Sequence, residues 1–297
     1  MYPDESRGFL PRAALLAAAL IWGSSFIIVK NTVDAVPPNF LLAVRFTFGA
    51  LALGLIFHKH FRKIDRGCFW RGAVMGAFLF LAYCFQTLGI QYTTPGKNAF
   101  LTAVYCILVP FVYWAVDGSR LSAVNFAAAV LCLAGIGLVS LQGDFTVSSG
   151  DLLTLIGGVF YALHMVTVAK VSRGRDLFVL TAVQFAAGAL LAWGTFLLFE
   201  PLPGRISWET GGGMAYLAVF CTAGALLFQN IGQKYTPPAQ ASLILSLESV
   251  FGVGFSVILG AETLTGKMIM GFILIFAAVI MNEIWPGLRL KQKNRAH

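Results

Sequence analysis

The sequence predicts an all-α integral membrane protein whose ten transmembrane helices form two inverted five-helix repeats. Three observations carry this prediction: of the 297 residues 58% are hydrophobic, only 11% are charged, and two blocks of sequence recur in the same order. An average soluble domain has about 25% charged residues. The composition therefore excludes an ordinary soluble enzyme and indicates that the bilayer is the solvent of this chain.

Ten apolar windows follow one another along the chain, each close to the ~20 residues that a helix needs to cross a bilayer. They lie at about residues 10–29, 38–57, 69–91, 95–116, 123–141, 150–169, 177–199, 212–233, 238–259 and 266–285. Proline-containing connectors such as Pro37-Pro38 and Pro237-Pro238 separate neighbouring windows. No convincing cleavage site follows the first window, so we expect it to remain in the protein as a span.

The basic residues predict how the chain is oriented in the membrane. With the N-terminus in the cytoplasm, 16 of the 21 Lys and Arg residues fall in cytoplasmic segments, four fall in outer connectors, and Arg45 lies within a span. Cytoplasmic connectors of membrane proteins carry such an excess. We therefore expect a multi-pass protein of the cell (inner) membrane with both termini, including a basic tail at 288–297, in the cytoplasm. The net charge of +8 then sets topology and does not indicate nucleic-acid binding.

The cysteines and histidines do not predict a metal or a cofactor site. The five cysteines are scattered along the chain, mostly inside apolar runs, where they are expected to be small core residues: Cys68, Cys84, Cys106, Cys132 and Cys221. We expect neither a bound metal nor a cofactor.

Two blocks of sequence recur in the same order. Ala43 to Leu51 matches Ala182 to Leu190, an offset of 139 in the numbering, and Phe85 to Pro95 matches Phe228 to Pro238, an offset of 143. Two blocks in the same order with nearly equal offsets indicate an internal repeat.

The repeat divides the chain into halves at 9–142 and 149–287, each with five predicted crossings. An odd number of crossings places the second half upside down relative to the first. Two such halves can exchange conformations so that a central site opens first to one side and then to the other. The repeat therefore favours a transporter, although gene duplication alone can also leave such a pattern.

Several short motifs, in their order along the two halves, resemble one transporter family. They are Trp22-Gly23, Arg45-Phe46, the Gln-x-x-Gly-x-x-Tyr-Thr pattern that begins at Gln86 and at Gln229, Val109-Pro110-Phe111, and the segment Gly260 to Thr265. Together they resemble the drug/metabolite transporter superfamily, EamA type, over nearly the whole chain. The resemblance implies a ten-span carrier, and many such carriers export amino acids and other small metabolites. The sequence departs from the family pattern at Glu248-Ser249, near the position usually given to a proline.

Glu248 is the first candidate site residue. It lies near the middle of the ninth window, with no cation among its sequence neighbours. An ionisable group at membrane depth is costly and usually faces the protein interior or water. We interpret Glu248 as a group that binds a substrate ammonium or gives and takes a proton; a carboxyl that is hydrogen-bonded between helices is the alternative.

Other polar and aromatic side chains are expected to line a central substrate-binding cavity together with Glu248. Trp22 and Ser25 are three residues apart, as are Tyr161 and His164, and the offset of 139 superposes the two pairs. Residues three apart share a helix face. The complete predicted set is Trp22, Ser25, Tyr83, Gln86, Tyr161, His164, Gln229 and Glu248. For each of them, hydrogen bonding or packing between helices is the alternative, and for His164 a proton relay is a further option.

Three more residues have predicted roles. Arg45 lies about two turns inside the second span, where a structural hydrogen bond or the binding of a substrate carboxylate would explain it. Asn98 and Gln240 follow proline-containing connectors at opposite faces of the membrane and are candidate gate residues, with turn formation as the alternative.

The sequence thus favours a secondary carrier, an exporter by resemblance, that moves a small amphipathic metabolite by alternating access, with protons as the candidate coupling ion. The expected partners are this metabolite and the lipid bilayer, with no nucleic acid, and the carrier is a monomer or a homodimer. The alternatives are a membrane-embedded enzyme that acts on lipid or an intramembrane substrate, and a sensor or scaffold. A His-Glu-x-x-His motif, a nucleotide-binding loop and a clustered His or Cys set are all absent from the sequence, so we expect no enzyme.

Overall fold

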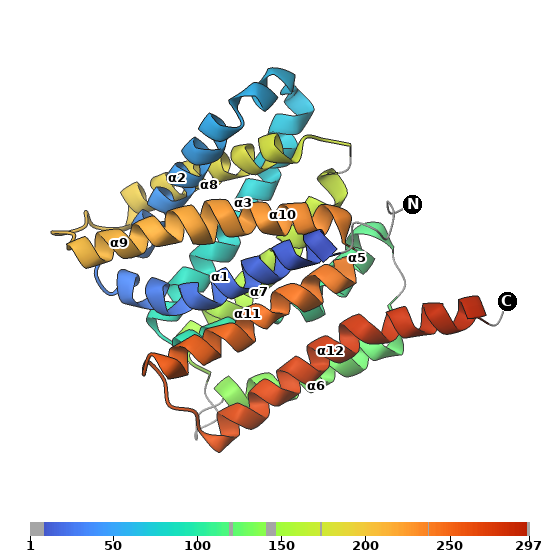
Figure 1. Cartoon of the computed structure of the whole chain (residues 1–297). Helices are drawn as coiled ribbons and strands as arrows, with labels where there is room; N and C mark the ends of the chain where they lie inside the picture. The colour runs from blue at the N-terminus through green and yellow to red at the C-terminus, as the bar shows by residue number, and fades with distance from the viewer. Residues whose placement is uncertain (1–8, 119–120, 141–146, 173, 237, 296–297) are drawn as a thin grey trace.

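The computed structural model describes residues 9–118, 121–140, 147–172, 174–236 and 238–295 of the chain (Figure 1). Within these ranges the side chains of residues 62–63, 117, 140, 238–240, 242 and 282–295 are not described. All regular elements in the described ranges are helices. The prediction of an all-α protein is confirmed.

The first half of the chain forms five helical segments. They are α1 (Phe9–Val33), α2 (Pro38–Ile56), α3 (Arg66–Gln91), α4 (Pro95–Thr102) with α5 (Tyr105–Asp117), and α6 (Ala123–Ser140), and a short 3₁₀ helix, η2 (His58–Lys63), follows α2. Local sequence explains several of the starts. Prolines occupy the first turns of α2 and α4, where a missing N–H costs nothing, and the Asp65 carboxylate caps α3 by accepting the N–H of Cys68.

The second half also forms five helical segments. They are α7 (Ser149–Val171), α8 (Leu177–Phe199), the continuous run of α9 (Trp208–Tyr216), the π-helix η3 (Leu217–Gly224) and α10 (Ala225–Tyr235), then α11 (Pro238–Ile258) and α12 (Gly266–Arg295). Ser148, Asp176 and Ser207 cap α7, α8 and α9 by accepting backbone N–H groups of the first turns.

The helices agree with the ten predicted windows in order and type. Within the described residues, seven helical stretches are long and apolar enough to cross a membrane, and three shorter apolar helices lie at Ala123–Val139, Leu243–Ile258 and Gly266–Met281. Two predicted windows are interrupted in ways that hydropathy does not indicate. The fourth changes from α4 to α5 through short-range backbone hydrogen bonds around Val104, and the eighth contains the π-helix η3.

The packing brings helices of the two halves together. In Figure 1, α2 lies beside α8, α1 lies between α10 and α11, and α6 pairs with α12 along one edge. Helix α3 packs against both α7 and α8. Gly76 makes the contact with α8 very close, because a Cβ there would lie 2.4 Å from the carbonyl oxygen of Gln184. These pairings are compatible with the predicted inverted repeat, which remains a prediction.

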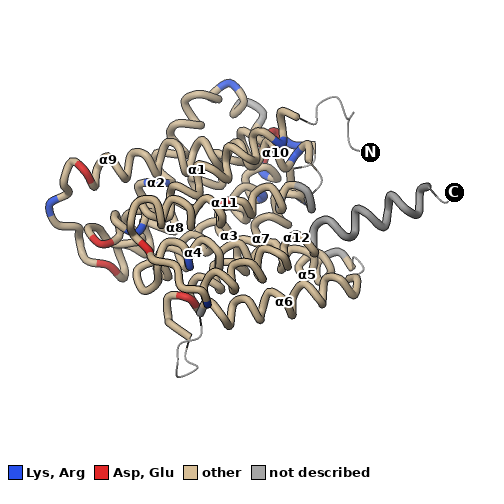
Figure 2. Tube along the Cα trace, turned by 60° about the horizontal axis from the view of Figure 1, so that its bottom comes forward, with Lys and Arg blue, Asp and Glu red and all other residues tan. Residues whose placement is uncertain are grey.

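The bundle has two ends, which we name by the chain termini. The terminal end is where α1 begins and α12 finishes, and the opposite end is where α1 finishes and α12 begins. Figure 2 shows that the acidic residues gather mainly at the opposite end, on the left of that view. The assignment of the terminal end to the cytoplasm remains a prediction.

Two charged contacts join α3 and η2 to the start of α8 at the terminal end. Asp65 pairs with Arg175, and the ring of His60 lies 2.6 Å from a carboxylate oxygen of Asp176. The N–H of Cys68, followed by the Arg175 guanidinium, lowers the pKa of Asp65 below its usual value. Burial raises the pKa of Asp176, but the hydrogen bonds from His60 and from the first turn of α8 outweigh it, so this pKa is also lowered.

Candidate functional site

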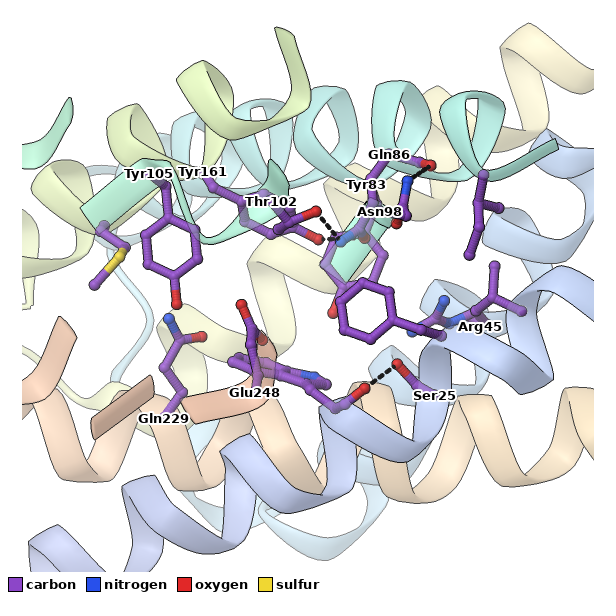
Figure 3. Close-up of a pocket in the computed structure, with 15 residues that line it drawn as sticks. Ser25, Arg45, Tyr83, Gln86, Asn98, Thr102, Tyr105, Tyr161, Gln229 and Glu248 are labelled. Atoms are coloured by element: carbon purple, nitrogen blue, oxygen red, sulfur yellow. Dashed lines mark hydrogen bonds between the residues drawn. The ribbon is translucent and has the colours of Figure 1, made fainter. Parts of the chain in front are cut away.

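A cavity lies at the centre of the bundle, between α1, α2, α3, α4, α5, α7, α10 and α11 (Figure 3). Helices of both halves of the chain therefore form its wall. Fifteen residues line it: Trp22, Ser25, Phe26, Val29, Arg45, Tyr83, Gln86, Ile90, Asn98, Thr102, Tyr105, Tyr161, Met165, Gln229 and Glu248.

The structure brings most of the predicted site residues to this cavity. Trp22, Ser25, Tyr83, Gln86, Tyr161, Gln229 and Glu248 line it, as do the separately predicted Arg45 and Asn98. His164 does not belong to the lining, although Tyr161, three residues before it, does. The side chain of Gln240 lies outside the described residues, and its gating role stays a prediction.

Glu248 contributes a buried carboxyl from near the middle of α11. Only 5% of the residue is exposed, and its side chain interacts with the phenol of Tyr105 on α5. Figure 3 shows Glu248 pointing into the space between the aromatic side chains of the wall. A carboxyl in such a place can bind a cation or exchange a proton when the cavity is hydrated.

Arg45 contributes the opposite charge from α2. Its Nε donates a hydrogen bond to the Thr222 hydroxyl at 3.0 Å, and its guanidinium lies 4.8 Å from the centre of the Tyr83 ring. The residue is 2% exposed. A cation–π contact and a hydroxyl acceptor hold the guanidinium in place but leave other N–H donors for a bound anion.

The π-helix η3 explains how two of these contacts arise. The Thr222 hydroxyl donates back to the carbonyl of Leu217, five residues earlier, and accepts from Arg45. The carbonyl of Cys221 accepts the indole N–H of Trp22 at 2.8 Å. A π-helical turn frees carbonyl groups from the regular ladder and is common at functional sites. Here it fixes one charged and one aromatic side chain of the cavity wall.

A chain of amides and hydroxyls forms the wall beside α3. Gln86 donates to the Thr102 hydroxyl at 3.0 Å and accepts from the Tyr161 hydroxyl at 2.9 Å. Asn98, at the start of α4, donates to the backbone carbonyl of Gln86 and to the Thr154 hydroxyl. These bonds orient the side chains of α3, α4 and α7 toward one another.

Two buried acceptors of the lining have no hydrogen-bond partner within the described part of the chain. They are the amide oxygens of Asn98 and Gln229. An unpaired buried carbonyl oxygen is unfavourable. Donors from water or from a bound solute would satisfy both, so this side of the cavity favours a ligand that carries N–H or O–H groups.

His164 lies in a different polar contact, toward α8. Its Nε2 is 3.2 Å from the amide oxygen of Gln184, and both residues are almost fully buried. Residues three apart on a helix share a face only roughly. Tyr161 and His164 therefore contact different neighbours, although they lie on the same side of α7. The geometry of His164 supports helix packing, the alternative given above.

Sequence reasoning did not find Tyr105, Thr102 and Thr222. A single tyrosine or threonine inside an apolar run gives no pattern of its own. One signal was available, since Tyr105 and Glu248 occupy corresponding positions when the repeat offset of 143 is applied. That correspondence would have drawn attention to Tyr105 as the counterpart of the most prominent site candidate.

The cavity is narrow in this structure. It leaves about 30 Å³ open to the centres of water molecules, enough for roughly two or three waters at ~10–15 Å³ each. A larger solute needs the walls to move apart. Among the described residues, no group of three or more His, Cys, Asp or Glu side chains could hold a metal ion.

A multi-span helical bundle with a buried, charged cavity between its two halves is typical of membrane transporters. Comparison with known proteins agrees. The model of the EamA-like transporter family matches residues 12–141 and again residues 148–283. The chain belongs to this family and is a multi-pass membrane transporter.

The relatives carry the same general description. An uncharacterized transporter of Archaeoglobus fulgidus is 33% identical over 90% of this chain and 83% of its own length. The uncharacterized inner membrane transporter YedA of Escherichia coli K12 is 22% identical over 90% of this chain and 89% of its own. A crystal structure with 21% identity covers 93% of this chain and 96% of its own, with a TM-score of 0.69, and shows that the fold is shared.

Proposed function

We propose that this transporter is a secondary active carrier of small amphipathic metabolites, such as amino acids and related solutes, that works by alternating access. The observation that carries the proposal is that the wall of one cavity holds both a buried carboxyl group, that of Glu248, and a buried guanidinium group, that of Arg45. Burying either charge at membrane depth is costly, so a functional use is the expected reason for keeping both.

The two charges are held separately. Among the described residues, no ion pair within 4.0 Å joins Arg45 to Glu248, and each has its own neutral partner, Thr222 and Tyr105 respectively. A solute with an ammonium and a carboxylate can therefore bind Glu248 with the first and Arg45 with the second. Each charge of the site is then neutralised by the solute, which offsets the cost of removing it from water.

The remaining wall fits the uncharged part of such a solute. The rings of Trp22, Phe26, Tyr83 and Tyr161 provide apolar surface, while Gln229 and Asn98 provide unpaired acceptors. Binding sites for small molecules combine these features: mostly apolar walls and a few polar groups that fix orientation.

Glu248 is also the proposed coupling group. When the solute leaves, the carboxyl loses its cationic partner, and taking up a proton is the simplest way to neutralise it in the cavity. A cycle in which Glu248 exchanges a proton for the solute would drive one against the gradient of the other. Export is the direction that the family resemblance implies.

Counterflow in proteoliposomes tests the carrier proposal. Vesicles loaded with a panel of unlabelled amino acids, amines and carboxylates are diluted into traces of the labelled compounds. We expect transient accumulation of at least one zwitterion, saturable and absent from protein-free vesicles. No accumulation across the panel, in protein shown to be folded by its thermal transition, would contradict the proposal.

The coupling role has its own test. Glu248→Gln should remove the pH dependence of transport while the protein stays folded, because the amide cannot exchange a proton. Glu209→Gln, at an exposed carboxylate of α9, is the matched control and should keep the wild-type pH profile. An unchanged pH dependence in Glu248→Gln would remove this residue from the coupling role.

A further inference from the structure

A second, smaller cavity lies between α5, α7 and α10, on the side of the central cavity that faces the terminal end. It is lined by Val109, Tyr113, Met165, Ala169 and Gln233. About 10 Å³ of it is open to the centres of water molecules, which is close to the space that one water needs, ~10–15 Å³.

The two cavities lie on the same faces of the same helices. On α7, Tyr161 lines the central cavity, Met165 lines both, and Ala169 lines the small one. On α10, Gln229 lines the central cavity and Gln233 the small one. Steps of four residues are close to one helical turn, so each face continues straight toward the terminal end.

Helix α5 continues in the same way. Tyr105 lines the central cavity, and Val109 and Tyr113, one and two turns further on, line the small cavity. Because α5 belongs to the first half of the chain and α7 and α10 to the second, the two cavities together follow a seam between the halves. A carrier that separates its halves along this seam would open the central cavity to the terminal end.

Met165 stands between the two cavities. It belongs to both linings, and 6% of the residue is exposed. Methionine is unbranched and has three rotatable side-chain bonds, so it can move aside without a shift of the helix backbone. A β-branched or aromatic side chain at this position would close the space more rigidly.

The lining of the small cavity, beyond Met165, is not purely apolar. The amide oxygen of Gln233 is buried and has no hydrogen-bond partner within the described residues. Tyr113 adds a phenol to the same lining. Buried polar groups around a space of this size are suited to water or to a passing polar solute.

We propose that the small cavity is the terminal-side section of the translocation pathway and that the Met165 side chain is the partition that separates it from the central site. The solute that passes is the small polar or zwitterionic metabolite of the central cavity, so this inference rests on the proposed function. Met165 is an apolar residue and supplies neither of the two charges that are proposed to bind the solute.

Access to the central cavity from the terminal end tests the proposal without a known solute. Ser25 is changed to cysteine in a background in which the five native cysteines are replaced, and a membrane-impermeant thiol reagent is added from the side that carries the C-terminus. Met165→Ala should increase the labelling rate and Met165→Trp should decrease it, each by about tenfold, the ratio that ~1.4 kcal/mol in a barrier produces. Equal rates in all three proteins would overturn the proposal.

Two further variants distinguish a specific role of Met165 and the small cavity from a general effect of adding a bulky side chain to the helix bundle. Ala169→Trp fills the small cavity and leaves Met165 intact, and it should also slow labelling from the terminal end. Met270→Trp adds the same ring on α12, where the native residue is 53% exposed, and should leave the rate unchanged. If Ala169→Trp folds and labels at the rate of the parent protein, the small cavity is not part of the pathway.

The labelling experiment also separates the two proposals. A protein that shows no counterflow but keeps the Met165 dependence of labelling would contradict the proposed transport activity and retain the pathway. A protein that shows counterflow with labelling rates independent of Met165 would retain the carrier and contradict the pathway.

Discussion

The two ends of the central cavity are closed in different ways. Toward the opposite end, a buried carboxylate and an ion pair join helices of the two halves. Toward the terminal end, one flexible side chain, Met165, separates the central cavity from the next space along the seam. Polar contacts between halves are directional and must be broken together, whereas a methionine side chain needs only to rotate.

Glu262 supplies the buried carboxylate at the opposite end. Its carboxylate accepts hydrogen bonds from the Thr94 hydroxyl, the N–H of Gly96 and the Ser256 hydroxyl. Thr94 and Gly96 lie at the start of α4, in the first half, and Glu262 lies between α11 and α12, in the second. The carboxylate therefore joins the two halves. Its negative charge is also stabilised by the positive end of the α4 dipole.

A second contact reinforces this end. The Asp151 carboxylate accepts from the Thr93 hydroxyl, and its other oxygen lies 3.5 Å from the ammonium of Lys97. That oxygen has no hydrogen bond within the described residues, so the attraction to Lys97 is coulombic. Asp151 is completely buried in the first turn of α7, where a negative charge is favourable.

The offsets of the predicted repeat pair residues at the two ends of the bundle. Met165 corresponds to Phe26 at the offset of 139, and Tyr113 corresponds to Ser256 at the offset of 143. On the terminal side these positions carry a flexible thioether and a phenol beside a small cavity. On the opposite side they carry a rigid ring and a hydroxyl bonded to Glu262. Along the seam between α5, α7 and α10 the terminal side therefore has fewer polar contacts than the opposite side, while the His60–Asp176 and Asp65–Arg175 contacts join the halves elsewhere at the terminal end.

The largest expected effect follows from removing the carboxylate that ties the halves together. Glu262→Ala leaves the Gly96 N–H and two hydroxyls without their acceptor, and we expect a loss of stability on the order of 3 kcal/mol. Thermal unfolding in detergent measures it. Labelling of a cysteine at position 25 from the opposite side should become faster at the same time. Glu209→Ala, at an exposed carboxylate of the same end, is the control; an equal effect in both variants would contradict a specific tie.

A smaller effect is expected at the second contact. Asp151→Asn keeps an acceptor for Thr93 but removes the charge that faces Lys97 and the dipole of α7, which should cost about 1 kcal/mol. The same thermal measurement checks it, with Asp34→Asn, at an exposed carboxylate of the same end, as the matched control. An increase in stability would mean that the cost of burying this charge exceeds the attraction to Lys97.

A substitution at Phe26, the predicted repeat counterpart of Met165, sharpens the comparison further. Phe26→Met gives the opposite side the residue of the terminal side, a change between apolar side chains that should cost roughly 1 kcal/mol. While Glu262 is intact, labelling of position 25 from the opposite side should keep its rate. A marked increase would show that the ring, and not the carboxylate, closes this end.

The smallest effect concerns the charged contacts at the terminal end. The pKa of Asp65 is lowered in the folded protein, mainly by the Cys68 N–H and then by Arg175, so its contribution to stability is complete above the usual value of 3.8 and is lost as the pH falls below it. Asp65→Asn should therefore flatten the decrease of the unfolding temperature below that pH.

Asparagine still caps the helix, so the change isolates the charge. Because this contact lies on α3 and α8, away from α5 and α10, labelling of position 25 should be unaffected. If the unfolding temperature of Asp65→Asn decreases in acid as much as that of the wild type, the decrease is caused by other carboxylates.

Most of the fold could be predicted from the sequence because a membrane span can be recognised from its length and apolar composition alone. The ends of helices were also predictable where prolines stand in the first turn, as in Pro38 and Pro95. The π-helix could not be predicted from local sequence, because the contacts made at it join residues far apart in the chain: Trp22 donates to the Cys221 carbonyl and Arg45 to the Thr222 hydroxyl.

The lining of the cavity was predictable where polarity contrasts with an apolar run, as for Glu248, Arg45 and Gln229. It was not predictable where the neighbouring helix decides. His164 and Tyr161 have similar positions on α7, yet one faces Gln184 and the other faces the cavity. Met165 could not be found at all from sequence, because a methionine in an apolar helix is ordinary and only the two spaces beside it give it a meaning.

Accessibility of the cavity from both sides tests the central claim most directly. A cysteine at position 25, on the cavity wall, is exposed to an impermeant thiol reagent from the side of the C-terminus and, separately, from the other side. Alternating access predicts labelling from each side and protection from both by one zwitterionic solute. Labelling that occurs from one side only, with and without solutes that stabilise the folded protein, would identify a one-sided pocket and contradict the carrier.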